Sequence, residues 1–474
     1  MNRKFIIVGL FSIIILSSKV LLAQEINPRP NIIHIIADDV GWDDLQCYGA
    51  PKIKTPNLDK LASEGMKFTS FYAPHATCTP TRAAIMTGRL APRINDGTGL
   101  EVLFPYSTSG LDPEKEICLP VILKKQGYVS GLIGKWHLGH LQKYLPYYHG
   151  FDTFFGIPYP NDMGAERRFG LVNVNNKMPP VPLIRDTTRI KDCDKYDLAE
   201  LPHWFLREAI DFLAYRKQDG KPFYLQWSNI ETHTPWLVPK GFEDRSTDGT
   251  YGDAVEYFDF SVGVLLTALK ELDLEKNTLV VVSSDNGNIL STNLDLEMAY
   301  GKFATADTSR KHILRGGKGQ SRYEGGTRVS CIMRMPGIIP AGTECKEITT
   351  GADLFTTFIL LAGAQIPSDR VIDGKDILPL MKGEKGAKVH EFFPGFQANG
   401  TLMSIRKGNW KLAVPSPKTW SIPALENYEL YNVKIDPGEK SNVAEQNLEK
   451  LAELKELAKQ VNEAVKNNKA LPYE

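Results

Sequence analysis

The sequence predicts an α/β protein in which a large doubly wound sheet is flanked by helices and a small C-terminal subdomain carries antiparallel strands. Two observations lead to this fold class. Short apolar runs alternate with predicted helices along most of the chain, and from about residue 389 short strand-like pieces replace this alternation. Alternating strands and helices are typical of a sheet with helices on both faces. The 474 residues also suit one large domain with a smaller one.

Four apolar runs are the strongest strand candidates. They are short and rich in β-branched residues, as buried strands of a parallel sheet usually are. These runs cover residues 31–37, 128–133, 223–227 and 279–283. Polar residues follow each run. Because ligands of doubly wound sheets bind outside the carboxyl ends of the strands, these polar residues predict one shared site.

Helices are predicted between the strands, at residues 55–64, 82–86, 119–126, 203–216 and 251–272. In the C-terminal part we expect strands at residues 391–393, 401–405, 410–412 and 428–431, and a charged helix at 447–466. Turn residues separate these strands. The expected division is therefore a main domain over residues 24–388 and a small α+β subdomain over 389–474.

The N-terminus predicts export. Two basic residues, Arg3 and Lys4, precede an apolar run at residues 5–15, and a small residue ends the segment. This order is typical of a cleaved signal peptide, here residues 1–23. The run is short for a membrane-spanning helix, and Lys19 interrupts it. We therefore expect a periplasmic or secreted protein without a stable membrane span, with an uncleaved anchor as the less favoured alternative.

Charge and cysteine content argue against two classes of protein. The 56 Lys and Arg residues balance the 56 Asp and Glu residues, so nothing in the composition indicates a nucleic-acid partner. The six cysteines are not spaced as in a small disulfide-stapled domain, and no CxxC pair supports a zinc site. Cys331 and Cys345 flank a segment that could fold back on itself, so they are a candidate disulfide.

The most informative motif is the segment of residues 78–89, CTPTRAAIMTGR. Pro80 suits a first helical turn, which would place Cys78 at a helix N-terminus, where free N–H groups favour an anion. A buried cysteine before a capped helix is the simpler alternative. The segment resembles the C-x-P-x-R…T-G-R signature of formylglycine-dependent type I sulfatases, arylsulfatase-like members of the alkaline-phosphatase superfamily. The resemblance implies that a maturating enzyme oxidises Cys78 to formylglycine.

A pair of acids follows the first predicted strand, and an acid and an amide follow the fourth. Asp38 and Asp39 would repel each other unless a positive group binds between them. Together with Asp285 and Asn286 they form an oxygen-rich set suited to Ca²⁺ or Mg²⁺. Two solvated turns are the alternative, since Asp-Asn-Gly is a common turn sequence. The resemblance assigns the four residues to Ca²⁺, with Mg²⁺ less favoured and the modified Cys78 completing the shell.

Basic residues in three further motifs complete the expected site. Residues 134–139, GKWHLG, resemble the family's G-K-W-H-x-G motif, in which Lys135 would neutralise charge and His137 would act as a base on the formylglycine hydroxyl. His233 resembles the family's H-x-P histidine, and Lys318 its G-K-G lysine. His233 and Lys318 would bind the sulfate together with Lys135, and either His233 or Lys318 would protonate the leaving oxygen. Three other histidines are expected to be structural: His34, His140 and His149.

The resemblance covers roughly residues 30–443 and implies hydrolysis of sulfate esters on a mixed sheet like that of alkaline phosphatase. A hydrated formylglycine carries two hydroxyls. One would attack sulfur with Asp285 as base, and His137 would deprotonate the other to expel sulfate. Arg82, Lys135 and Lys318 would offset the repulsion between the anionic ester and the nucleophile.

Two other functions remain open on the sequence alone. Phosphodiester or phosphonate hydrolases of the same superfamily share the acidic metal shell, and a non-catalytic binder of sulfated glycans would keep the fold without turnover. Sulfated small molecules or glycans are the expected partners, most of all carbohydrate sulfates. Four tyrosines are candidate sugar-stacking rings, with ordinary core or loop positions as the alternative: Tyr144, Tyr147, Tyr148 and Tyr159.

Overall fold

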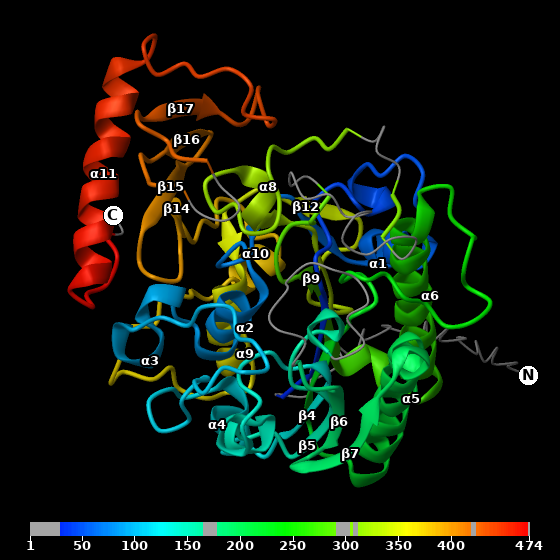
Figure 1. Cartoon of the computed structure of the whole chain (residues 1–474). Coiled ribbons are helices and arrows are strands. Elements are labelled where there is room, and N and C mark those ends of the chain that lie inside the picture. Colours follow the sequence, from blue (N-terminus) through cyan, green and yellow to red (C-terminus); the bar gives the residue numbers. More distant parts are fainter. Residues whose placement is uncertain (1–28, 165–177, 291–303, 307–310, 419–422, 473–474) are drawn as a thin grey trace, which may run out of the picture.

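A ten-stranded mixed sheet forms the centre of the computed structural model, which describes residues 29–164, 178–290, 304–306, 311–418 and 423–472 (Figure 1). The predicted signal peptide, residues 1–23, lies outside the described residues. Across the sheet the strands follow the order β12 (Thr343–Cys345), β2 (Met66–Phe68), β11 (Cys331–Arg334), β9 (Thr278–Ser284), β1 (Asn31–Ala37), β8 (Phe223–Ser228), β4 (Val129–Lys135), β5 (Thr153–Ile157), β6 (Val181–Arg185) and β7 (Thr188–Cys193).

The four predicted strands form the middle of this sheet. Strand β1 has the predicted bounds, β8 begins at the predicted residue and ends one residue later, and the bounds of β4 and β9 differ from the prediction by one or two residues. Strands β9, β1, β8, β4 and β5 run parallel, whereas β11, β6 and β7 pair antiparallel with their neighbours. The fold class is therefore confirmed, and the sheet is mixed because antiparallel strands extend the parallel centre on both sides.

Helices cover both faces of the sheet, as Figure 1 shows. One face packs against α1 (Pro56–Glu64), α5 (Lys195–Asp219) and α6 (Gly249–Glu271). The other face packs against α2 (Cys78–Thr87), α4 (Leu119–Lys124) and α9 (Gly351–Leu361). Strand β1 contributes to the hydrophobic core on both faces of the sheet. Ile33 and Ile35 pack on the face covered by α1, α5 and α6, and Ile32 and Ile36 pack on the face covered by α2, α4 and α9. This alternation follows from the two-residue period of a strand.

Helix α5 begins earlier than predicted. The prediction started the helix at residue 203, directly after Pro202, but the helix runs through this proline from Lys195. Its start is set by a capping box, in which the side chain of Asp194 accepts hydrogen bonds from the backbone of Tyr196 and Asp197. Three further short α-helices lie within the described residues: α3 (Ile94–Gly97), α8 (Glu324–Thr327) and α10 (Leu378–Met381).

A second, antiparallel sheet lies at the C-terminal end of the chain. Its strands pair in sequence order as β14 (Phe392–Phe396), β15 (Leu402–Lys407), β16 (Trp410–Ala413) and β17 (Glu429–Asn432). Helix α11 (Leu448–Lys466) packs on it through Leu454, Ala458 and Val461, and Figure 1 shows the helix along the outer side of the sheet. The predicted antiparallel strands and charged helix are therefore confirmed.

The candidate disulfide between Cys331 and Cys345 is wrong, since all six cysteines are free. Cys331 lies on β11 and Cys345 on β12, and strand β2 lies between these two strands. Two strand spacings amount to ~9–10 Å, more than the ~7 Å between Cα atoms that a disulfide can span.

Within the described residues, none of the helices combines the length and apolar character that crossing a membrane requires.

Candidate functional site

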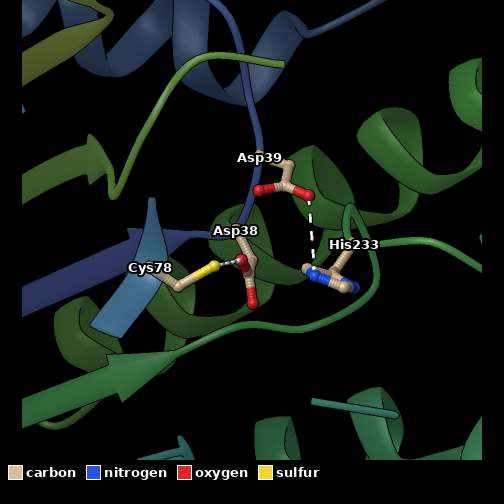
Figure 2. Close-up of side chains that lie close together, drawn as sticks. All are labelled: Asp38, Asp39, Cys78 and His233. Atoms are coloured by element: carbon tan, nitrogen blue, oxygen red, sulfur yellow. Dashed lines mark hydrogen bonds and ion pairs between the residues drawn. The ribbon is translucent and has the colours of Figure 1, made fainter. Parts of the chain in front are cut away.

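The polar residues that follow the central strands meet at one edge of the sheet, as predicted. Asp38 and Asp39 come after β1, and Asp285 comes after β9. These two strand ends are neighbours, because Ala37 of β1 pairs with Ser284 of β9. Lys135 is the last residue of β4, and His233 lies beyond the end of β8. Figure 2 shows Asp38, Asp39, Cys78 and His233 converging.

Cys78 is the first residue of helix α2, the placement that its motif predicts. It is almost fully buried, and its Sγ lies 3.5 Å from Oδ1 of Asp38 (Figure 2). Burial raises the pKa of the Cys78 thiol far above its ordinary value, against the opposing charges of Lys135 and Lys318. Because the thiolate is the nucleophilic form, an unmodified Cys78 is a poor nucleophile here.

Asp38 is held as a carboxylate by the cations around it. Lys135 Nζ lies 2.6 Å and Arg82 Nη2 3.5 Å from Oδ2 of Asp38. Burial alone would raise the pKa of Asp38, but the charges of Lys135, Arg82 and Lys318 hold it well below its ordinary value. The side chain of Asp38 is therefore an anion at neutral pH.

Asp285 has the opposite balance. Arg82 binds it through Nε at 3.0 Å and Nη2 at 2.8 Å from Oδ2. Burial, and then the charge of Asp38, nevertheless raises the pKa of Asp285 to about 6. Arg82 also donates from Nη1 to the carbonyl of Lys135 at 2.9 Å, so it joins the ends of β9 and β4.

Lys318 joins Asp39 to His233. Its Nζ lies 2.7 Å from Oδ2 of Asp39 and 2.9 Å from Nε2 of His233. The other ring nitrogen of His233, Nδ1, is 2.7 Å from the carbonyl of Thr234. A proton on Nδ1 satisfies both contacts, which leaves Nε2 as an acceptor for Lys318. Burial, and then the charge of Lys318, lowers the pKa of His233.

His137 presents a free acceptor in the buried site. Its Nε2 is 2.9 Å from the carbonyl of Leu103, so Nε2 carries the proton. Its Nδ1 is buried without a hydrogen-bond partner. Burial, and then the charge of Lys135, lowers the pKa of His137 well below its ordinary value. The ring is therefore neutral, and the lone pair of its Nδ1 has no donor.

The oxygen-rich group fits a divalent cation. Ligand atoms of Asp38, Asp39, Cys78 and His233 all lie within 4.8 Å of one another. Asn286 donates from Nδ2 to Oδ1 of Asp39 at 2.7 Å, while its own Oδ1 is buried without a partner. A buried amide oxygen without a donor costs free energy unless something positive binds it. A hard cation with oxygen ligands meets this requirement.

Two groups that hold the site in place, Thr232 and Leu103, carry no signal in the sequence. Thr232 Oγ1 donates to the carbonyl of Asp38 at 2.6 Å and accepts from its backbone N–H at 3.2 Å, which ties β8 to the acidic turn. Leu103 places its carbonyl on His137 and its N–H 3.3 Å from Oγ1 of Thr79. Thr232 precedes His233 and could have been found only by knowing that β8 neighbours β1.

Two of the four candidate stacking tyrosines belong to the core. Tyr144 and Tyr159 are only 7% and 4% exposed, which leaves no free ring face for a sugar. Tyr147 and Tyr148 are 54% and 42% exposed.

Two of the histidines expected to be structural, His34 and His149, are buried and contact other side chains of the core. His34 contacts Ser283, and His149 contacts Cys118.

Comparison with known families gives two matches. The family model described as "Sulfatase" matches residues 30–364, and the model described as "N-sulphoglucosamine sulphohydrolase, C-terminal" matches residues 320–468. The first spans the central sheet and all predicted site residues.

Individual proteins are also similar to this chain. N-acetylgalactosamine-6-sulfatase of Canis lupus familiaris is 38% identical over 410 residues, which cover 84% of this chain and 74% of the relative. Arylsulfatase A of Homo sapiens is 34% identical over 442 residues, covering 87% and 83%. Among solved structures, the PsFucS1 sulfatase from Pseudoalteromonas sp. superposes with a TM-score of 0.80 at 26% identity, covering 94% of this chain and 92% of that chain.

Proposed function

The chain belongs to the sulfatase family and is a sulfuric ester hydrolase, and from this premise we propose that it desulfates carbohydrates with a formylglycine made from Cys78 and a bound Ca²⁺. One observation carries the proposal. Cys78 lies buried at the start of α2, with its Sγ 3.5 Å from the carboxylate of Asp38. Three cations surround that carboxylate group and its neighbours: Arg82, Lys135 and Lys318.

The surroundings of Cys78 support its modification. Its buried thiol has a raised pKa, so the unmodified residue is a poor nucleophile. Once formed, formylglycine supplies a hydrated aldehyde with two hydroxyls, which a cysteine or serine nucleophile lacks. The partner needed for this change is a maturating enzyme that oxidises Cys78. Peptide mass spectrometry of protein from a host with such an enzyme should find the aldehyde at residue 78 and at no other cysteine.

The carboxylates and Asn286 would hold the cation. Asp38 and Asp39 offer carboxylate oxygens within 4.8 Å of each other. Asp285 and Asn286 lie beside them, since the backbone N–H of Asp39 donates to Oδ1 of Asp285 at 3.2 Å and Nδ2 of Asn286 donates to Oδ1 of Asp39 at 2.7 Å, which leaves Oδ1 of Asn286 as a further oxygen ligand. A divalent ion there supplies positive charge for the oxygens of the sulfate. Ca²⁺ is favoured over Mg²⁺, since Ca²⁺ accepts irregular shells, whereas Mg²⁺ demands near-ideal octahedral geometry and keeps several waters.

The remaining side chains divide the work of proton transfer and anion binding. Lys318 and His233 lie in contact beside Asp39, so both bind the sulfate and one of them donates a proton to the leaving oxygen. Asp285 takes the proton of the attacking group. His137 accepts a proton at Nδ1, the nitrogen that has no partner. Arg82 and Lys135 hold the carboxylates in place and offset negative charge.

Carbohydrate sulfates are the proposed substrate class. The support is the relative named N-acetylgalactosamine-6-sulfatase, at 38% identity over 84% of this chain. Matured enzyme should release sulfate from sulfated N-acetylhexosamines, with turnover that depends on Cys78. Matured enzyme without sulfate release from any sulfated saccharide in a defined set would contradict the proposal.

We further propose that the protein is exported and acts in the periplasm or outside the cell. The support is the basic and apolar pattern of residues 1–23, which lie outside the described part of the chain. In this proposal residues 24–388 form the catalytic domain and residues 389–474 the smaller subdomain. N-terminal sequencing of the mature protein from its native host should begin at Gln24.

A further inference from the structure

The loop of residues 315–326, which carries Lys318, is fixed against the active site on one side. The backbone N–H of Lys318 donates to the carbonyl of Asn288 at 2.8 Å, and that of Gly319 donates to Ala76 at 2.6 Å. Ala76 lies two residues before Cys78. Gly287 packs so closely on the loop that a Cβ there would meet the carbonyl of Gly325 at 1.7 Å. These contacts fix the position of the loop relative to Cys78.

On its other side the same loop is bonded to the C-terminal sheet. Arg315 donates from Nη1 to the hydroxyl of Tyr431 on β17 at 3.1 Å. Ser404 on β15 donates from Oγ to the carbonyl of Ser321 at 2.9 Å. Figure 1 shows α8, the end of this loop, between the C-terminal sheet and the large sheet. The loop is thus held from both sides.

A buried ion cluster reinforces this second side. Glu324 is fully buried and accepts from Lys411 Nζ at 3.0 Å and from the hydroxyl of Tyr72 at 2.7 Å. Its backbone N–H donates to Oε2 of Glu439 at 2.8 Å, and Lys411 lies 3.6 Å from the other oxygen of Glu439. Lys411 and Glu439 come from the C-terminal subdomain, whereas Glu324 ends the loop. Such a cluster is costly to break, because the loss of Lys411 leaves Oε1 of Glu324 and Oε1 of Glu439 buried without their shared cation. Oε2 of Glu324 would keep the more distant Arg328 and Arg406, each at 3.5 Å.

We propose that the C-terminal sheet is a positioning element for catalysis, because Lys411, Glu439 and Tyr431 hold the 315–326 loop so that Lys318 reaches Asp39 and His233. The inference rests on the proposed role of Lys318 in binding sulfate. A displacement of ~1 Å at a reacting group can lower a rate ~10²-fold, so a loosened loop lowers turnover without touching the site itself.

Three full-length variants test this role. Lys411→Met removes the charge that joins Glu324 to Glu439. Tyr431→Phe removes only the hydroxyl that accepts from Arg315, and it carries the test alone if Lys411→Met does not fold. The matched control is Tyr428→Phe, the same chemical change three residues earlier, on a ring that packs in the core around α11 with Lys455 Nζ 4.7 Å from its centroid.

Each variant is measured with Lys318 present and in a Lys318→Ala background. We expect Lys411→Met to lower kcat about 10-fold and Tyr431→Phe about 3-fold when Lys318 is present, but each less than about 2-fold in Lys318→Ala, since residues that act through one another are not additive. Tyr428→Phe should change kcat in neither background. Equal losses in both backgrounds would overturn the proposal, because they would show a general effect on the fold.

Hydrogen exchange gives a readout that needs no turnover. Amides of residues 315–326 should exchange faster in Lys411→Met and Tyr431→Phe, and at the wild-type rate in Tyr428→Phe. Unchanged exchange in the first two variants contradicts the positioning role. If the wild-type enzyme released no sulfate, the proposed function would fail, while the exchange result would still decide whether the C-terminal sheet holds the loop.

Discussion

Two buried ion clusters lie at either end of the 315–326 loop, and they differ in which atoms remain unpaired. The site cluster pairs three acids with three cations: Asp38, Asp39, Asp285, Arg82, Lys135 and Lys318. Beside it, Oδ1 of Asn286 and Nδ1 of His137 are buried without partners. The second cluster surrounds Glu324, both of whose carboxylate oxygens accept hydrogen bonds. Oε1 of Glu439 in the same cluster accepts none, but the Lys411 ammonium lies 3.6 Å away as its counter-charge.

The difference separates a binding site from a joint between subdomains. Buried ion pairs are weak evidence for stability in general, because desolvation offsets the attraction between the charges. In the second cluster both carboxylate oxygens of Glu324 are hydrogen-bonded to other residues of the fold. This cluster therefore stabilises the contact between the 315–326 loop and the C-terminal sheet. The site cluster leaves acceptors for groups that the fold does not provide. Substitutions in the first cluster should therefore change activity most, and substitutions in the second should change stability most.

The largest expected effect is on Cys78. Cys78→Ala should lower sulfatase turnover by a factor on the order of 10⁴ or more, because it removes the proposed nucleophile. Its melting temperature should stay close to that of the wild type, since Sγ makes a single long contact of 3.5 Å with Asp38. Kinetics and thermal unfolding on the same preparation check both parts. Retained turnover in Cys78→Ala would contradict the claim that substitutions in the site cluster change activity most.

Lys318 and His233 should show the next largest effects. Lys318→Ala or His233→Ala should lower turnover by roughly 10²-fold or more, the scale expected for losing a general acid or a contact to the developing charge. Lys346→Ala is the control, because Lys346 is exposed and pairs only loosely with Glu344 at 3.7 Å. Wild-type kcat in Lys318→Ala would remove the lysine from the mechanism.

Calcium should stabilise the site cluster alone. Calorimetric unfolding with Ca²⁺ at 100 times its Kd should show a gain of about 2.7 kcal/mol over chelated protein. Asn286→Ala should weaken the affinity for Ca²⁺, because it removes the unpartnered oxygen. The same titration on Lys411→Met should give the wild-type gain. A variant at Asn286 that binds Ca²⁺ with wild-type affinity argues against the assignment of this ligand.

A smaller effect concerns the pH dependence of stability at the second cluster. Burial raises the pKa of Glu439 to about 7, against the charge of Lys411. A raised folded pKa means that the folded state binds the extra proton, so Glu439 favours folding below its unfolded pKa and loses this contribution as pH rises towards 7. In the wild type the free energy of unfolding should fall between the unfolded pKa of Glu439 and pH 7. In Glu439→Gln this fall should be smaller by about 1–3 kcal/mol. Urea unfolding at several pH values measures it, and an unchanged slope would contradict this pKa.

The elements that position the site could be predicted because their signals are local. Strand β1 was predicted at its observed bounds from seven consecutive residues, all of them buried. The meeting of Asp38, Asp39 and Asp285 followed from the rule that parallel strands end at one edge. Strands β2 and β12 are three residues long, too short for any pattern, and were missed. The start of α5 was misplaced because its capping box outweighs Pro202.

The joint between the subdomains could not be predicted from the sequence. Glu324 and Lys411 lie 87 residues apart, and neither carries a local signal for its partner. A charged residue is usually solvated, so neither residue type by itself indicates a buried pair. The contact depends on how the C-terminal sheet packs on the loop. Thr232 was missed for the same reason, since its bond to Asp38 joins residues 194 positions apart.

The central claim is that the site cluster acts on sulfate esters. With the proposed divalent ion and three cations, Arg82, Lys135 and Lys318, the site suits a monoanionic sulfate ester better than a phosphate monoester, which carries nearly two charges at neutral pH. The most direct measurement is kcat/KM of the matured enzyme on matched sulfate and phosphate esters of one sugar. We predict a clear preference for the sulfate ester, which Cys78→Ala abolishes. A preference for the phosphate ester would contradict the account.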